Sequence, residues 1–218
     1  MFDLIILASG VGSRCGLDYP KQFYKINNKS MLSYVIDLFG DIIDIQNIIV
    51  TTIPDQLNLF NNEIKSYKNI KFIEGANTRQ ESVYNALKFV KGSKVIIHEA
   101  VRPMITKEYI EELLLLEEEC IVPYAHITNT VYSKDVNAYI NREDLYSIQL
   151  PQIYPTKQLK DAHNLARINN NIYTDDSSLY FNELQTDIHF VKGLCGNIKI
   201  TSQSDLALLN KIRILGGI

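Results

Sequence analysis

Tryptophan is absent from this 218-residue sequence, and it contains only 3 cysteines, 6 prolines and 10 glycines. The cysteines lie far apart without C-x-x-C spacing, which argues against a disulfide framework or a zinc site and favours a reducing compartment. No apolar run reaches the roughly 20 residues of a membrane-spanning helix, and no secretory signal pattern opens the chain. These absences predict a cytoplasmic protein that has no membrane partner.

A large excess of one charge is also missing, since 22 Lys and Arg residues against 25 Asp and Glu residues give a formal net charge of −3. This balance argues against a nucleic-acid partner bound through a broad basic face, but it leaves room for a local basic pocket. The hydrophobic content of 46% is enough for a substantial core. The length suits a single domain over residues 1–218.

Short apolar runs rich in β-branched residues alternate with helical patterns along most of the chain. This alternation predicts an α/β fold with a Rossmann-like, mostly parallel sheet and helices on both faces. One of the helices is expected from Pro54 to about Tyr67. Between residues 124 and 150 the pattern changes to short alternating segments, which predicts a β-arm that protrudes from the sheet. The expected strands lie near residues 3–8, 47–52, 70–74, 94–98, 120–123, 188–191 and 198–201.

The first expected strand leads directly into a glycine-rich loop over residues 9–22. Three glycines in this loop permit positive φ angles and close backbone approach, and they leave successive N–H groups free to face an anion. Arg14 and Lys21 add two positive charges. The loop therefore predicts a phosphate-binding site. Its three glycines are Gly10, Gly12 and Gly16.

The spacing of this loop distinguishes it from two other nucleotide-binding loops. It reads G-x-G-x-x-x-G rather than G-x-G-x-x-G, and the second expected strand ends in Val50-Thr51-Thr52 without the acidic residue that binds a dinucleotide ribose. The Walker A pattern, G-x-x-x-x-G-K-[ST], occurs nowhere in the sequence. A nicotinamide cofactor is therefore disfavoured.

Three further stretches place polar residues beside expected strands. Residues 75–82 lead into a helix N-terminus that favours anionic ligands, although an ordinary capped helix is the better explanation of this stretch by itself. Glu99 follows a strand at the sheet edge where ligands bind, and Mg²⁺ takes one or two carboxylates together with substrate phosphates; a solvated glutamate is the alternative. Lys199 lies within the expected strand at 198–201 and either protects a sheet edge or points into the pocket.

Taken in order, these stretches resemble the cytidylyltransferases that make 2-C-methyl-D-erythritol cytidine diphosphate and the related ribitol-5-phosphate cytidylyltransferases. The family pattern begins with L-A-A-G-x-G-x-R…P-K-Q, and its later motifs follow here in the same order over nearly the whole chain. The matching stretches are residues 7–22, Gly75 with Arg79 and Ser82, and residues 98–103, 149–152, 174–176 and 197–201.

The resemblance implies transfer of CMP from CTP to a polyol phosphate, with release of pyrophosphate and with Mg²⁺ as cofactor. It implies that Arg14, Lys21 and Lys199 are catalytic residues that stabilise charge on the phosphates. It assigns Glu99 to the metal and to the acceptor. It also implies a nucleotide-binding set that consists of Ala8, Ser9, Gly10, Gly12, Gly16, Gly75, Arg79 and Ser82.

The expected arm resembles the segment that these enzymes exchange across a homodimer, so residues 124–150 are expected to form a dimerisation arm. Within it, Thr130 matches a threonine near the acceptor. Arg142 matches an arginine that reaches into the neighbouring subunit and binds the acceptor phosphate, a role suited to its planar, bidentate guanidinium group. The alternative for Arg142 is a solvated arm residue.

Two departures from the family pattern bear on the identity of the acceptor. Glu99 replaces the metal-binding Asp, and Gly196 stands where the erythritol enzymes often carry a second acidic residue. Both departures weaken the erythritol match and Val101 suits the ribitol branch, although residues 174–176 look like the erythritol branch. We therefore expect a ribitol 5-phosphate-like acceptor used for surface polysaccharide. The alternatives are a 2-C-methyl-D-erythritol 4-phosphate cytidylyltransferase of isoprenoid biosynthesis and a nucleotide-binding homologue without catalysis.

Overall fold

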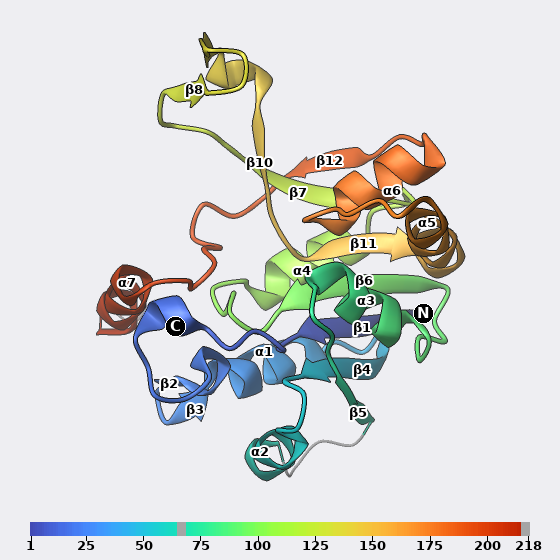
Figure 1. The fold of residues 1–218 in the computed structure, drawn as a ribbon. Helices are drawn as coiled ribbons and strands as arrows, with labels where there is room; N and C mark the ends of the chain where they lie inside the picture. Colours follow the sequence, from blue (N-terminus) through green and yellow to red (C-terminus); the bar gives the residue numbers. More distant parts are fainter. Residues whose placement is uncertain (65–68, 215–218) are drawn as a thin grey trace.

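The computed structural model describes residues 1–64 and 69–214, and its centre is a twisted sheet (Figure 1). The strands of this sheet are β1 (Phe2–Leu7), β4 (Ile45–Thr52), β5 (Ile70–Glu74), β6 (Lys94–Glu99), β7 (Ile121–His126), β10 (Tyr146–Ile148), β11 (Gln152–Pro155) and β12 (His189–Lys192). Their spatial order is β10-β7-β11-β6-β1-β4-β5, and β12 pairs with β7. The described part of the chain thus forms an eight-stranded sheet.

The sheet is mostly parallel, as expected. Strand β1 runs parallel to both of its neighbours, β4 and β6, and β4 runs parallel to β5. Strand β12 is parallel to β7, whereas β10 and β11 are antiparallel to the strands beside them. The carboxyl ends of β1, β4, β5 and β6 therefore meet at one edge of the sheet, where ligands bind in open α/β folds.

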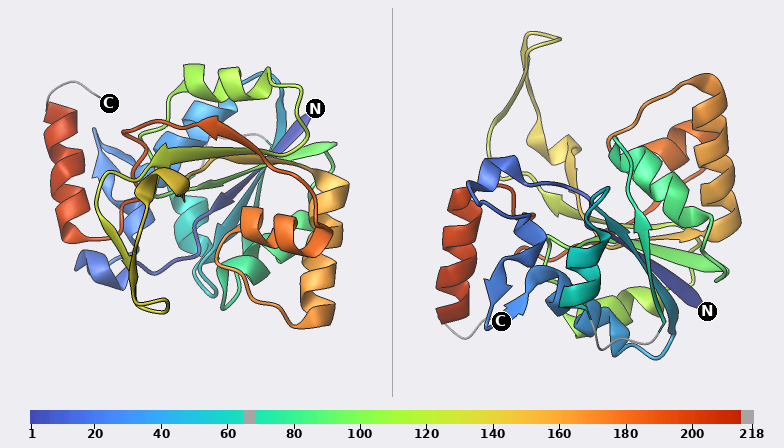
Figure 2. Two further views of the ribbon diagram at one scale, coloured as in Figure 1. Left: turned by 90° about the horizontal axis from the view of Figure 1, so that it is seen from above. Right: turned by 60° about the horizontal axis from the view of Figure 1, so that its bottom comes forward.

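Helices cover both faces of the sheet, which confirms the predicted α/β architecture (Figure 2). One face is covered by α1, α2 and α4, and the other by α3, α5 and α6. Helix α7 packs beside the glycine-rich loop. The helices are α1 (Met31–Gly40), α2 (Leu57–Glu63), α3 (Arg79–Leu87), α4 (Lys107–Leu114), α5 (Thr156–Asn169), α6 (Asp176–Leu184) and α7 (Gln203–Ile214).

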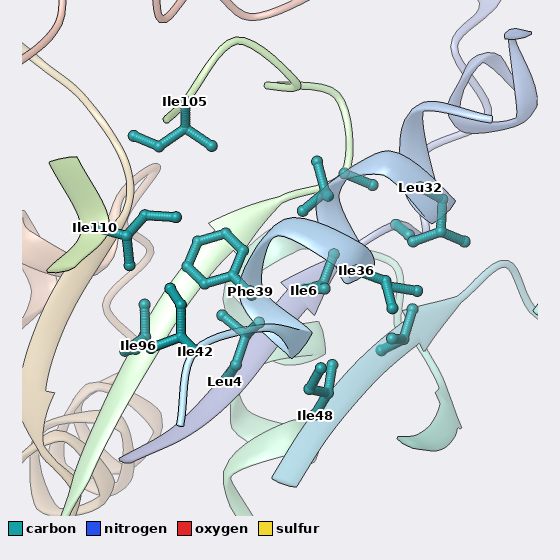
Figure 3. Close-up of a cluster of buried hydrophobic side chains, with 14 of the residues drawn as sticks. Leu4, Ile6, Leu32, Ile36, Phe39, Ile42, Ile48, Ile96, Ile105 and Ile110 are labelled. Atoms are coloured by element: carbon teal, nitrogen blue, oxygen red, sulfur yellow. The ribbon is translucent and has the colours of Figure 1, made fainter. Parts of the chain in front are cut away.

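The alternation of side chains along β1 divides the core into two layers. Leu4 and Ile6 point toward α1, where Ile36 and Phe39 meet them, as Figure 3 shows. Ile5 points to the opposite face and joins the cluster under α3 and α5. Because successive residues of a strand face opposite sides, the continuous apolar run from Leu4 to Leu7 is buried on both faces, as the sequence predicts.

Polar side chains fix the start of three helices. The hydroxyl groups of Ser30, Thr78 and Thr106 accept hydrogen bonds from the backbone N–H three residues later, at the starts of α1, α3 and α4. Such caps satisfy N–H groups that have no partner within the helix. The cap at Thr78 places Arg79 at the first position of α3, beside the carboxyl ends of the strands.

Between β7 and β10 the chain leaves the sheet and forms a two-stranded hairpin of β8 (Val131–Ser133) and β9 (Ala138–Ile140). This segment stands away from the body of the molecule in Figures 1 and 2. Residues 124–126 and 146–148, which were expected in the arm, belong to the main sheet instead. We call residues 127–145 the hairpin segment. A smaller hairpin joins β2 (Lys25–Ile26) and β3 (Lys29–Ser30).

Two predicted elements differ from the structure. The expected strand at 198–201 is an extended segment with no strand partner among the described residues, and a single backbone hydrogen bond, from Ile200 N to Val101 O at 2.9 Å, joins it to the loop after β6. The helix expected from residue 54 to residue 67 is α2, which begins later, and residues 65–68 lie outside the described residues. Across residues 1–64 and 69–214, no helix is long and apolar enough to span a bilayer.

The two-layer core predicts a sharp contrast between two isoleucines. The Ile36 side chain is fully buried, whereas that of Ile43 is 92% exposed. We expect Ile36→Ala to lower the free energy of unfolding by about 2–5 kcal/mol because it leaves a cavity under α1. Ile43→Ala should change it by less than about 0.5 kcal/mol. Urea denaturation of both variants checks this, and equal effects would contradict the assigned core.

Candidate active site

A cleft of about 330 Å³ lies at the carboxyl ends of β1 and β6. Its walls come from the glycine-rich loop, the start of α3, the end of β6 and the segment around Lys199. The described lining contains one carboxylate, Glu99, and four basic side chains. This excess of positive charge suits a ligand with several phosphate groups. The basic side chains are Arg14, Lys21, Arg79 and Lys199.

Most of the residues that the sequence assigns to a site lie on this cleft. Of the assigned residues, Gly16, Gly75, Thr130 and Arg142 are not part of its described lining. The residues that do line the cleft are Ala8, Ser9, Gly10, Gly12, Arg14, Lys21, Arg79, Ser82, Glu99 and Lys199.

Two hydrogen bonds hold the start of the glycine-rich loop. Ala8 N donates to the Thr51 hydroxyl at 3.0 Å, and Gln22 Nε2 donates to Ala8 O at 2.6 Å. Gln22 is only 1% exposed and also lines the cleft. Gln22 received no role in the sequence analysis, although it closes the first motif. Its effect is to tie both ends of the loop together at the end of β1.

The Lys21 side chain passes beneath the glycine-rich loop and reaches the segment around Lys199. Its Nζ donates to Ile200 O at 2.8 Å, and its side chain is largely buried. Burial lowers the pKa of Lys21 from its usual value, while the nearby Cys15 acts in the opposite direction. The Ile200 carbonyl therefore fixes the ammonium group next to Lys199, so that two amines from distant parts of the chain share one side of the cleft.

Gly12 makes room for Lys21. It has a φ of +72°, and a Cβ atom at this position would lie 2.7 Å from Lys21 Cγ. Gly16 also has a positive φ, of +66°, and a Cβ there would collide with Gln203 of α7. These two glycines are therefore required by the shape of the loop, whereas Gly10 has open space around it.

Gly75 and Ser82 shape the wall of the cleft at the start of α3 through contacts within the protein. A Cβ atom on Gly75 would collide with Ser9. The Ser82 hydroxyl accepts from Ala76 N at 2.9 Å and donates to Thr78 O at 2.9 Å. Both residues therefore set the turn before α3, and Ser82 in addition lines the cleft.

Glu99 is the centre of a cluster of ion pairs. Its Oε1 lies 2.8 Å from Lys199 Nζ and 3.8 Å from Arg79 Nε, and its Oε2 accepts from Arg102 Nε at 3.1 Å. Burial by itself would raise the pKa of Glu99, but Lys199 and Arg102 hold it below its usual value. The glutamate is therefore ionised and draws three basic side chains to the end of β6.

Arg102 and Asn197 connect this cluster to the segment around Lys199. Arg102 Nη1 donates to Asn197 O at 3.0 Å, and Asn197 Nδ2 donates to Leu150 O. His98 Nε2 lies 3.0 Å from Arg102 O, and burial lowers the pKa of His98 to about 4, so the ring is neutral near pH 7. These residues belong to the sequence motifs but had no predicted role. In the structure they support the segment that carries Lys199.

The donor set at the cleft fits Mg²⁺ only in company with substrate phosphates. Among the described residues, no group of three His, Cys, Asp or Glu side chains is placed to hold a metal ion. Glu99 is the single carboxylate of the described lining. Mg²⁺ usually retains several waters and binds one or two carboxylates plus phosphates, so Glu99 and a bound nucleotide together make a suitable ligand set.

Thr130 and Arg142 lie away from the cleft, in the exposed hairpin segment. Arg142 Nη1 donates to Thr128 O at 2.5 Å, and its Nε donates to Glu143 at 3.2 Å. Neither residue belongs to the described lining of the cleft in this single chain. Contacts within the single chain therefore give no support to the role at the acceptor that was expected for these two residues.

The conformation of Gly12 predicts a difference between two loop glycines. Gly12→Ala should lower the free energy of unfolding by about 1–3 kcal/mol, because alanine disfavours positive φ and its methyl group would displace Lys21. Gly10→Ala should change it by less than about 0.5 kcal/mol, since nothing lies within 4 Å. Chemical denaturation measures both values. A stable Gly12→Ala variant would contradict the tight contact with Lys21.

Comparison with known proteins extends these observations. The model of the family described as "IspD: 2-C-methyl-D-erythritol 4-phosphate cytidylyltransferase" matches residues 2–213. A protein of that name from Bacillus cytotoxicus is 32% identical over 217 residues, which cover 95% of this chain and 96% of the relative. The protein of that name from Clostridioides difficile is 33% identical, with coverage of 97% and 93%.

Solved structures share the fold. The 4-diphosphocytidyl-2C-methyl-D-erythritol synthase of Anaerococcus prevotii superposes with a TM-score of 0.85 at 26% identity and covers 96% of this chain and 94% of its own. The bifunctional IspDF of Campylobacter jejuni gives a TM-score of 0.82 at 30% identity, and the match covers 94% of this chain and 53% of that protein.

These findings favour the erythritol branch over the ribitol branch that we expected from Glu99 and Gly196. Substitution at these two positions is therefore a weaker guide to the branch than similarity over the whole chain. The matches also favour a CTP-dependent enzyme over a non-catalytic homologue. This chain belongs to the IspD family of 2-C-methyl-D-erythritol 4-phosphate cytidylyltransferases.

Proposed function

We propose that this chain transfers CMP from CTP to 2-C-methyl-D-erythritol 4-phosphate and releases pyrophosphate, a step of isoprenoid biosynthesis. Membership of the IspD family supports the acceptor. The observation that carries the chemistry is the cleft itself, in which Arg14, Lys21, Arg79 and Lys199 face a single carboxylate, Glu99.

The reaction is an in-line displacement at phosphorus. A phosphate oxygen of the acceptor forms a bond to the α-phosphorus of CTP, the bond from that phosphorus to the bridging oxygen breaks, and pyrophosphate leaves with the electron pair. No covalent nucleophile of the protein is needed. The protein has to position the reactants and stabilise the charge that shifts toward the leaving group.

The positions of the basic residues suggest which phosphate group each of them binds. Lys21 and Lys199 line the same cleft, and Ile200 O and Glu99 hold their amines, so we assign both to the phosphate that is attacked. Arg14 lies on the exposed side of the loop, and we assign it to the departing pyrophosphate. Backbone N–H groups of the glycine-rich loop bind the remaining phosphate oxygens.

At the far wall, Arg79 and Ser82 with the turn after β5 bind the cytidine end of the nucleotide. Glu99 and the phosphates of CTP would hold Mg²⁺, which when bound neutralises phosphate charge and fixes the phosphate geometry. Ion pairs to Lys199 and Arg102 occupy both oxygens of Glu99, so Mg²⁺ would compete with these two side chains for the carboxylate.

We further propose that the functional form is a homodimer in which the hairpin segment of one copy completes the site of the other. Thr130 and Arg142 are exposed in the single chain, and the tyrosines of the hairpin, Tyr132 and Tyr139, are 47% and 76% exposed. An exposed aromatic surface favours a protein partner. In the dimer, Arg142 of the partner copy binds the acceptor phosphate, and Thr130 of the partner copy lies near the acceptor.

The choice of acceptor has a direct test. With CTP and Mg²⁺, we expect pyrophosphate release with 2-C-methyl-D-erythritol 4-phosphate, and a kcat/KM at least about tenfold lower with ribitol 5-phosphate, because an acceptor with the wrong hydroxyl groups leaves polar groups of the site unpaired. A coupled pyrophosphate assay with both acceptors measures the ratio. A preference for ribitol 5-phosphate would place the chain in the ribitol branch. No pyrophosphate release with either acceptor would refute the proposed activity.

The buried amine of Lys21 predicts a large catalytic effect. We expect Lys21→Ala to lower kcat by roughly 10²–10³, the scale for loss of one donor that stabilises transition-state charge. Lys25→Ala removes an equal charge from an exposed position four residues away, outside the described lining of the cleft, and should leave kcat within about twofold. Steady-state kinetics of both variants decide this, and near-normal turnover in Lys21→Ala would remove Lys21 from the mechanism.

A further inference from the structure

The guanidinium group of Arg79 lies between carboxylates from two sides. Asp176 Oδ2, at the start of α6, lies 2.6 Å from Arg79 Nη1, and Glu99 Oε1, at the end of β6, lies 3.8 Å from Arg79 Nε. The Arg79 side chain is 22% exposed and lines the cleft, whereas Asp176 is 1% exposed. Arg79 thus joins a buried anion behind the cleft to the cleft itself.

A second buried residue supports Asp176. His163 of α5 is fully buried, and its Nε2 lies 3.2 Å from Asp176 Oδ1. Burial alone would raise the pKa of Asp176, but Arg79 and His163 keep it below its usual value. Asp176 is therefore ionised, with one oxygen toward His163 and the other toward Arg79.

The two carboxylates beside Arg79 are not equivalent. Glu99 also pairs with Lys199 and Arg102 and faces the cleft, so a metal ion would compete for Glu99, and nucleotide phosphates would compete with Glu99 for its basic partners. Asp176 is enclosed by the protein and lies outside the described lining of the cleft. Its hold on Arg79 therefore persists when Glu99 exchanges partners.

One donor of Arg79 lacks a hydrogen-bond partner within the described part of the protein. This donor is Nη2, which is buried, and a buried donor without a partner is destabilising. Because Nη2 is enclosed, a nucleotide in the cleft would meet the exposed part of the Arg79 side chain rather than this atom.

We propose that Asp176, backed by His163, is a positioning residue that holds Arg79 in its nucleotide-binding orientation before CTP arrives. A free arginine side chain has many rotamers, and ordering it during binding lowers affinity. The buried ion pair removes that loss in advance. This inference rests on the proposed function, since it assumes that the cleft binds CTP.

A purely structural role, in which the ion pair only attaches α3 to the helices beside it, is the competing explanation. The neighbouring Gln80 already makes such an attachment, because its Oε1 accepts from Tyr173 N at 2.8 Å and its Nε2 donates to Asn171 O at 3.1 Å. The attachment of α3 therefore does not depend on the ion pair alone. A change in the affinity for CTP when Asp176 is replaced distinguishes the positioning role from the purely structural role.

The first experiment measures CTP binding by calorimetry and steady-state kinetics in Asp176→Asn. We expect the Kd and the KM for CTP to rise about tenfold or more, and kcat to stay within about threefold, because a contact made equally in the ground and transition states affects KM alone. Asp161→Asn is the matched control: it removes the same charge from an exposed position on α5, outside the described lining of the cleft. Its Kd should stay within about twofold.

A double-mutant cycle tests whether Asp176 acts through Arg79. If it does, Asp176→Asn should no longer weaken CTP binding in an Arg79→Gln background. Equal losses in both backgrounds, or an unchanged Kd in Asp176→Asn, would overturn the inference. Failure of the unmodified protein to bind CTP would refute the proposed function instead, so the two failures are distinguishable.

If Asp176→Asn does not fold, His163→Leu replaces it in the same measurement. This variant keeps both members of the ion pair and removes only the support behind Asp176. We expect a smaller rise in the CTP Kd, of about threefold, that disappears in the Arg79→Gln background. A Kd equal to that of the unmodified protein would overturn the inference.

Discussion

The ionised carboxylate of Glu99 at the end of the central strand β6 is the constraint around which the site is arranged. It is 6% exposed, and a charge so far removed from water persists only with oppositely charged partners. Lys199, Arg102 and Arg79 supply them, from three separate stretches of the chain. Two of these partners, Lys199 and Arg79, are among the four basic side chains of the described lining, so the ion pairs that stabilise Glu99 also position part of the positive charge that attracts phosphate.

A third basic side chain of the described lining is fixed by the backbone instead. Lys21 is oriented by the carbonyl of Ile200, and it fits beneath the loop because Gly12 has no side chain. The two arrangements differ in their response to a ligand. Phosphate oxygens compete with Glu99 for Lys199 and Arg79, whereas the Ile200 carbonyl and Asp176 remain in place. The cleft thus contains basic groups that are fixed by the Ile200 carbonyl and by Asp176, and basic groups that a bound nucleotide would release from Glu99.

The acceptor half of the site has a different character. The cleft of the single chain has the residues for a nucleotide, but Thr130 and Arg142 lie in the hairpin segment that stands away from the sheet (Figure 1). A dimer that inserts this segment would join acceptor binding to assembly, so that only the assembled protein has a complete site. The match to the IspD family favours the erythritol acceptor even though Glu99 and Gly196 depart from its pattern, because two positions weigh less than similarity along residues 2–213.

The sequence by itself determined the α/β class, the strands β1, β4, β5, β6, β7 and β12 of the main sheet, the capped start of α3 and most of the residues that line the cleft. Apolar periodicity, capping residues and ordered motifs are local properties. Prediction from the sequence failed at residues 198–201, where the alternation of a strand occurs in an extended segment held by one hydrogen bond to Val101. Only the tertiary structure decided that Lys21 rests on Ile200, that Glu99 gathers three basic groups, and that Asp176 lies behind Arg79. The contacts of Lys21 with Ile200, of Glu99 with Lys199 and of Asp176 with Arg79 join residues about 100 to 180 positions apart. The distance between such residues is set only when the strands are placed side by side, so no local sequence pattern predicts it.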